Sequence, residues 1–120
     1  MFLNSFKKNG QKDINEFAYD QAVVLEINLE GLDDFGTADQ HKEIDDLQEN
    51  IAQILPPNAG IDGDEYGDGE CIIYIYGPSA DAIFNKVQPV LKSSSFNHIN
   101  VTLQYGLAED PATIDKKFTL

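Results

Sequence analysis

Five acidic side chains fall between positions 62 and 70, and carboxylates this close together could bind a cation. They are Asp62, Asp64, Glu65, Asp68 and Glu70. A calcium-binding EF-hand loop starting at Asp62 would match at its first, third and sixth positions. It fails at the fifth position, which is Tyr66, and at the twelfth, where Ile73 replaces the bidentate glutamate. We predict a solvated hairpin tip, with a weak cation site of another type as the alternative, and assign no metal and no cofactor.

Paired carboxylates could also act as general acid and base. The adjacent pairs Asp33–Asp34 and Asp45–Asp46 are poor candidates. Neighbouring residues on a helix point in different directions, and nothing apolar nearby would raise a pKa. The sequence also holds no G-x-S-x-G motif, phosphate-binding loop or dinucleotide fingerprint. We therefore expect that the protein is not an enzyme.

Histidine and cysteine complete the inventory of reactive groups. The histidines are His41, near a predicted helix start, and His98, before a predicted strand. The single cysteine, Cys71, lies in the apolar run CIIYIY, which predicts a small buried side chain rather than a reactive thiol. No Cys–His pair or metal-ligand spacing results. One cysteine rules out an internal disulfide and fits a reducing cytoplasm.

Two tyrosines, Tyr74 and Tyr76, alternate on one predicted strand. Aromatic side chains on an open sheet can stack on RNA bases, but that use requires basic surroundings. Glu26 and Glu30 are predicted on the same face, so nucleic-acid binding is disfavoured. Tyrosines on a partly apolar face rimmed by acids are typical of protein-binding surfaces. The alternative is that the N-terminal arm or a second copy of the chain covers them.

The net charge of −13 lies in one stretch. Residues 26–70 hold fourteen acids and one lysine, whereas the other 75 residues hold seven acids and seven lysines, and there is no arginine. A field this one-sided attracts cationic partners and repels nucleic acid and anionic lipid.

Hydrophobic periodicity predicts the elements that position these groups. Residues 22–30 and 98–106 alternate apolar and polar side chains, as half-buried strands do. A helix over Thr37–Leu55 should begin with a capping box of Thr37 and Gln40 and end at Pro56. Strands over Ile61–Tyr66 and Glu70–Tyr76 should form a hairpin around Asp68–Gly69, a long loop being the alternative.

A second helix should follow, capped by Ser79 and running to Lys92, with Pro89 kinking or shortening its last turn. The tail 113–120 could add an edge strand through Ile114, Phe118 and Leu120. The order strand, helix, strand, strand, helix, strand predicts an α+β ferredoxin-like βαββαβ sandwich. Its four-stranded antiparallel sheet would carry both helices on one face, with the C-terminal edge strand as an addition.

That architecture leaves one sheet face open. The alternation places ten residues there: Val24, Glu26, Asn28, Glu30, Ile72, Tyr74, Tyr76, Asn100, Thr102 and Gln104. The length of 120 residues fits one domain over residues 21–120, preceded by an arm over residues 1–20. We expect no membrane span, since no apolar run is long enough, and no signal peptide.

One motif resembles a known family. Residues Asp62 to Phe84 read D-G-x-E-x-G-x-G-E-x-x-x-Y-x-Y-G-P-x-A-D-x-x-F. With a V-x-P-x-L helix end at Val87–Leu91 and a later Tyr105-Gly106, this pattern resembles a widespread family of small acidic bacterial proteins, over roughly residues 22–106. The resemblance implies no catalytic residues. As a small, strongly acidic single domain, this chain also resembles by general type the immunity proteins of contact-dependent inhibition systems.

We therefore expect a non-catalytic protein-binding module, exemplified by an immunity protein that inhibits a basic, nuclease-like bacterial toxin. The alternative is a small-ligand sensor or regulatory domain. The expected partner is a cationic protein, with no nucleic acid and no membrane, and the chain is a monomer or a homodimer in the cytoplasm. The expected partner-binding residues are Glu43, Asp46, Glu49, Asp62, Asp64, Glu65, Asp68, Tyr74 and Tyr76.

Overall fold

The structure is a computed structural model that describes residues 20–29 and 36–120. Nearly all of the predicted N-terminal arm therefore lies outside the described residues. So do Glu30 of the predicted open face and the Asp33–Asp34 pair.

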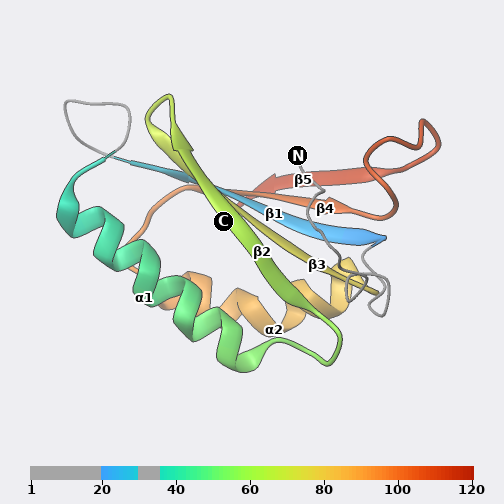
Figure 1. Cartoon of the computed structure of the whole chain (residues 1–120), viewed down its shortest axis with the longest axis horizontal. Helices are drawn as coiled ribbons and strands as arrows, with labels where there is room; N and C mark the ends of the chain where they lie inside the picture. Colours follow the sequence, from blue (N-terminus) through green and yellow to red (C-terminus); the bar gives the residue numbers. More distant parts are fainter. Residues whose placement is uncertain (1–19, 30–35) are drawn as a thin grey trace, which may run out of the picture.

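The described chain is an α+β fold with two helices and a five-stranded antiparallel sheet (Figure 1). The elements in chain order are β1 (Gln21–Asn28), α1 (Ala38–Ile54), β2 (Gly60–Gly67), β3 (Glu70–Gly77), α2 (Ala80–Ser93), β4 (Ile99–Gln104) and β5 (Asp115–Thr119). The strand order across the sheet is β2-β3-β1-β4-β5, so β2 and β5 form its two edges. Both helices lie on one side of the sheet (Figure 1).

The core forms between the sheet and the helices because the strands alternate as predicted. Val23, Leu25 and Ile27 of β1 are fully buried, and they stand beside buried side chains of β3 and β4 in register. The helices add Ile44, Leu47 and Ile51 from α1 and Ala80, Ile83, Val87 and Leu91 from α2. Within residues 20–29 and 36–120, no polar or charged side chain is buried. The fold is therefore held mainly by apolar burial.

Helix α1 begins at the predicted capping box. The backbone N–H of Thr37 donates to Gln40 Oε1 at 2.8 Å, and that of Gln40 donates to Thr37 Oγ1 at 3.1 Å. These bonds satisfy two donors that a helix start leaves unpaired. Helix α2 is capped by Ser79, whose hydroxyl accepts from the Ala82 N–H at 3.1 Å. Pro89 does not end it, because α2 continues to Ser93.

The hairpin of β2 and β3 has the predicted two-residue turn, and the alternative of a long loop is wrong. Asp68 has a φ of 54° and Gly69 a φ of 78°. Two successive positive φ values define a type I′ turn, whose twist matches that of the flanking strands. One irregularity was not predicted, since a β-bulge at Asp62 shifts the register between Ile61 and Gly63.

The C-terminal tail forms the additional edge strand, so the sheet has five strands rather than four. β5 pairs with β4, and Phe118 packs edge-on against Phe84 of α2 with ring centroids 5.1 Å apart. Lys116 and Lys117 are exposed on this edge, where charge discourages pairing with another chain.

Candidate functional site

The charged groups of α1 and β2 lie together because α1 packs beside the β2 edge of the sheet. Two contacts join them. The Gln48 Nε2 donates to Asp64 Oδ2 at 2.6 Å, and the His41 and Tyr66 rings lie 4.3 Å apart. Residues 36–70 carry ten acids and one lysine, whereas residues 71–120 carry four of each. We call the acidic side chains of α1 and of the β2–β3 hairpin the acidic flank.

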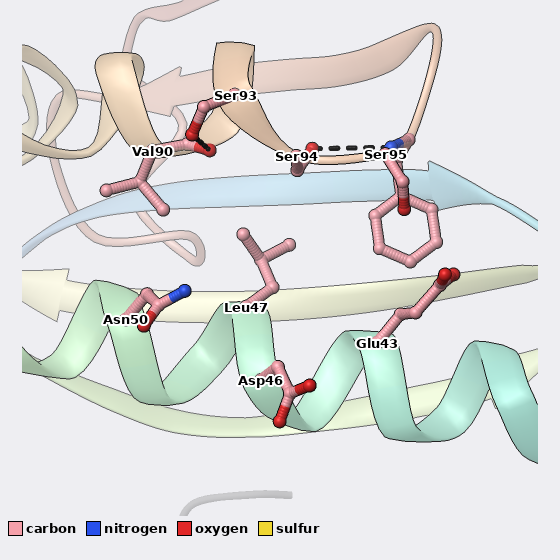
Figure 2. Close-up of a pocket in the computed structure, with 9 residues that line it drawn as sticks. Glu43, Asp46, Leu47, Asn50, Val90, Ser93, Ser94 and Ser95 are labelled. Atoms are coloured by element: carbon pink, nitrogen blue, oxygen red, sulfur yellow. Dashed lines mark hydrogen bonds between the residues drawn. The ribbon is translucent and has the colours of Figure 1, made fainter.

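The helical part of the flank contains Glu43, Asp46 and Glu49, all exposed. Glu43 and Asp46 border a groove between α1 and the end of α2 (Figure 2). The groove has a volume of about 190 Å³ and an apolar floor that includes Leu47 and Val90. Asp46 is paired with Lys42 at 3.2 Å, whereas Glu49 does not line the groove. Carboxylates beside an apolar floor can bind a segment that is both cationic and apolar.

The hairpin acids divide between the two faces of the sheet, because side chains alternate along β2. Asp64 stands opposite Ile73 on the helix side, and its bond from Gln48 fixes it there. Glu65 stands opposite Ile72 on the open face. Asp68 is exposed at the turn. The side chains of Asp64 and Glu65 therefore leave β2 toward opposite faces of the sheet.

The open face brings Glu65 together with the tyrosines. The Tyr74 hydroxyl donates to Glu65 Oε1 at 2.9 Å. Tyr74 and Tyr76 are half-buried, and with Asp62, Gly63, Asp64 and Glu65 they line a hollow of about 320 Å³. We call Asp62, Glu65, Tyr74, Tyr76 and the space between them the tyrosine hollow. Partial burial, then the hydrogen bond and charge of Glu65, raise the pKa of Tyr74 to about 12.

Two further reactive side chains, Cys71 and Tyr66, lie on the helix side of the sheet. Cys71 is fully buried, as predicted, and burial raises the pKa of its thiol to about 12. Tyr66, its cross-strand neighbour on the helix side, also has a pKa raised by burial. The stretch from Asp62 to Glu70 is a strand, a turn and the start of a second strand, so the residues with partial EF-hand spacing do not form an EF-hand loop.

Across residues 20–29 and 36–120, no group of three His, Cys, Asp or Glu side chains is arranged to hold a metal ion. Neither of the two helices in these ranges has the length and apolar content to cross a bilayer.

Sequence reasoning missed three features of this surface. It did not predict the contacts between α1 and β2, the groove at the end of α2, or the bulge that brings Asp62 beside the tyrosines. The glycines at 60 and 63 were the available signal, because glycine in a strand often marks a bulge or a close approach. Comparisons of the chain with protein-family models, with curated proteins and with solved structures found no match.

Proposed function

We propose that this protein is a non-catalytic binding module whose partner is a cationic protein. The observation that carries the proposal is the position of the charge in the fold. Ten acids lie on adjacent elements, α1 and the β2–β3 hairpin, at one edge of the sheet. The opposite edge, β5, carries Lys116 and Lys117. The molecule therefore presents one strongly negative side to an approaching partner.

Such a field favours proteins over the other partner classes. Nucleic acid and anionic membranes carry phosphate charge of the same sign and are repelled. A small-ligand sensor would need a site that encloses its ligand, whereas the groove and the tyrosine hollow both open to solvent. A basic protein is attracted at long range, and aromatic anchors can then supply short-range affinity.

A nuclease-like bacterial toxin is the partner class that fits best. The substrate groove of a nuclease must be cationic, so an acidic protein can occupy it in place of nucleic acid. On this proposal the chain is an immunity protein that binds the toxin in the cytoplasm, as a monomer or a homodimer. The acids of α1 supply long-range attraction, and the hairpin and tyrosines supply contacts.

We also propose that β1–α1–β2–β3–α2–β4 is a ferredoxin-like unit and that β5 extends it. The strand order β2-β3-β1-β4 and the placement of one helix after β1 and one after β3 support this assignment. The assignment concerns architecture alone, because this fold hosts many unrelated functions.

Co-expression with a candidate toxin tests the proposed function. The candidate is the C-terminal domain of any large secreted protein encoded beside this chain, produced in a host that it kills. We expect growth to be restored by the wild-type chain and less well by the double variant Glu43→Lys, Glu49→Lys. The proposal is wrong if the wild-type chain gives no protection and the two purified proteins do not associate.

A further inference from the structure

Both tyrosines of the hollow stand opposite glycines. In the pairing of β2 with β3, Gly60 is the partner of Tyr76 and Gly63 is the partner of Tyr74. A Cβ atom placed on either glycine would meet no atom of residues 20–29 and 36–120 within 4 Å. Because β2 is an edge strand, no further strand of the sheet lies beyond these glycines. At the cross-strand position in β2, each tyrosine therefore has a glycine as its neighbour rather than a larger side chain.

The β-bulge adds a carboxylate to this place. It inserts Asp62 between the two glycines, and Asp62 then lines the hollow with Glu65. Partial burial raises the pKa of Asp62. Burial and the charges of Asp62 and Glu65 raise the pKa of Tyr76. Two exposed carboxylates thus border two half-buried aromatic rings in a hollow that opens to solvent.

We propose that the tyrosine hollow is a receptor site for one arginine side chain of the protein partner. This proposal rests on the proposed function, because it assigns the chemical group through which the cationic protein partner would bind. A guanidinium is planar, so it can stack on a tyrosine ring while its N–H groups donate to a carboxylate. Tyr74 already holds Glu65 through its hydroxyl, which leaves the second carboxylate oxygen for the ligand.

Titration of the full chain with N-acetyl-arginine amide tests the site, with amide NMR shifts as the readout. The neutral isostere N-acetyl-citrulline amide is the control ligand. We expect saturable shifts centred on residues 62–65 and 74–76 with the arginine probe alone. The proposal is overturned if citrulline binds equally well, or if the shifts follow all acids of the chain without saturating.

Two matched pairs of variants separate the site from net charge. The double variant Asp62→Asn, Glu65→Gln should lower the affinity for the arginine probe by at least about fivefold. Glu43→Gln, Glu49→Gln removes the same charge from α1 and should leave the affinity within about twofold. Gly60→Val should weaken binding because it places a side chain opposite Tyr76, whereas Gly67→Val, opposite Glu70, should not. Circular dichroism checks the fold of each variant, and equal effects within either pair reject the site.

Failure of this site and failure of the proposed function give different results. If a cationic toxin binds in a salt-dependent manner but Tyr74→Leu leaves its dissociation rate unchanged, the proposed function stands and the arginine site is rejected. If the arginine probe binds in the hollow but the toxin domain does not associate, the site stands and the proposed function is rejected.

Discussion

At the scale of single residues, the Tyr74 hydroxyl is the most direct reporter of the acidic open face. It donates to Glu65 and has a pKa raised to about 12. The folded-state pKa lies above the ordinary value, so the stability that this group contributes is present below pH 10 and is lost as the pH rises through about 12. We expect the Tyr74 resonance to titrate near pH 12 in a spectrum of tyrosine labelled at the ring carbon that bears the hydroxyl. Tyr74→Phe assigns the resonance.

The Glu65→Gln variant separates the effect of the Glu65 charge on the pKa of Tyr74 from the effect of burial. It removes the charge of Glu65 but leaves the partial burial, which is the larger cause. The pKa of Tyr74 should therefore fall toward 10 without reaching it. A Tyr74 pKa near 10 in the wild-type protein would contradict the geometry of this pair.

Among the structural elements, the β2–β3 turn makes a local test possible. Gly69 has a φ of 78°, which disfavours any side chain, whereas Gly67 does not have a positive φ. Gly69→Ala should lower the free energy of unfolding by about 1 kcal/mol. Gly67→Ala, two residues away with open space around its Cα, should leave stability unchanged or raise it by a few tenths of a kcal/mol. Urea unfolding of both variants measures the difference, and equal losses would show that the turn is not type I′.

The assignment of the two sheet faces makes a second prediction at this scale. Ile75 is fully buried toward the helices, whereas Thr102 lies on the open face opposite Lys117 of β5. Ile75→Asp should destabilise the domain by about 4 kcal/mol or more, since it buries an unpaired charge. Thr102→Asp should cost less than about 1 kcal/mol. Similar thermal midpoints for the two variants would mean that the faces are assigned wrongly.

The sequence predicted correctly the elements whose local residue patterns are regular. The alternation in β1 and β4, the Thr37–Gln40 capping box and the Asp68–Gly69 turn are local signals, and each gave the observed structure. The faces of β2 were not predicted, because the bulge at Asp62 breaks the two-residue period on which such a prediction relies. The contact of Gln48 with Asp64 joins positions sixteen residues apart, and no local pattern encodes it.

The same limit applied to the candidate site. Residue type and alternation identified the acids and both tyrosines as partner-binding candidates. They could not show that Asp64 would be turned toward α1 while Glu65 would pair with Tyr74. The tyrosine hollow depends on two glycines opposite two aromatic residues, which requires the exact register of β2 and β3.

At the scale of the whole molecule, stability should be independent of divalent metal. Within residues 20–29 and 36–120, the acids between Asp62 and Glu70 do not form a group that could hold a metal ion. Replacing millimolar calcium or zinc with a chelator should leave the thermal midpoint unchanged. A rise of more than about 5 °C with calcium would indicate a cation site in this hairpin, because a ligand that binds only the native state stabilises it.

The central claim is that charge on the acidic flank, rather than net charge alone, attracts the partner. Stopped-flow association with the candidate toxin domain proposed for the co-expression test checks this claim most directly, using two charge-matched variants. Glu43→Lys, Glu49→Lys alters the flank, and Glu109→Lys, Asp115→Lys changes the net charge equally at exposed positions after β4. Raising the ionic strength from physiological to about 1 M shortens the Debye length from about 8 to about 3 Å.

We predict that the wild-type association rate falls at least about tenfold over this range. The flank variant should associate about tenfold more slowly than wild type at physiological salt, whereas the matched control should change less than about twofold. Equal slowing by the two variants, or a wild-type rate that does not depend on salt, would contradict the account.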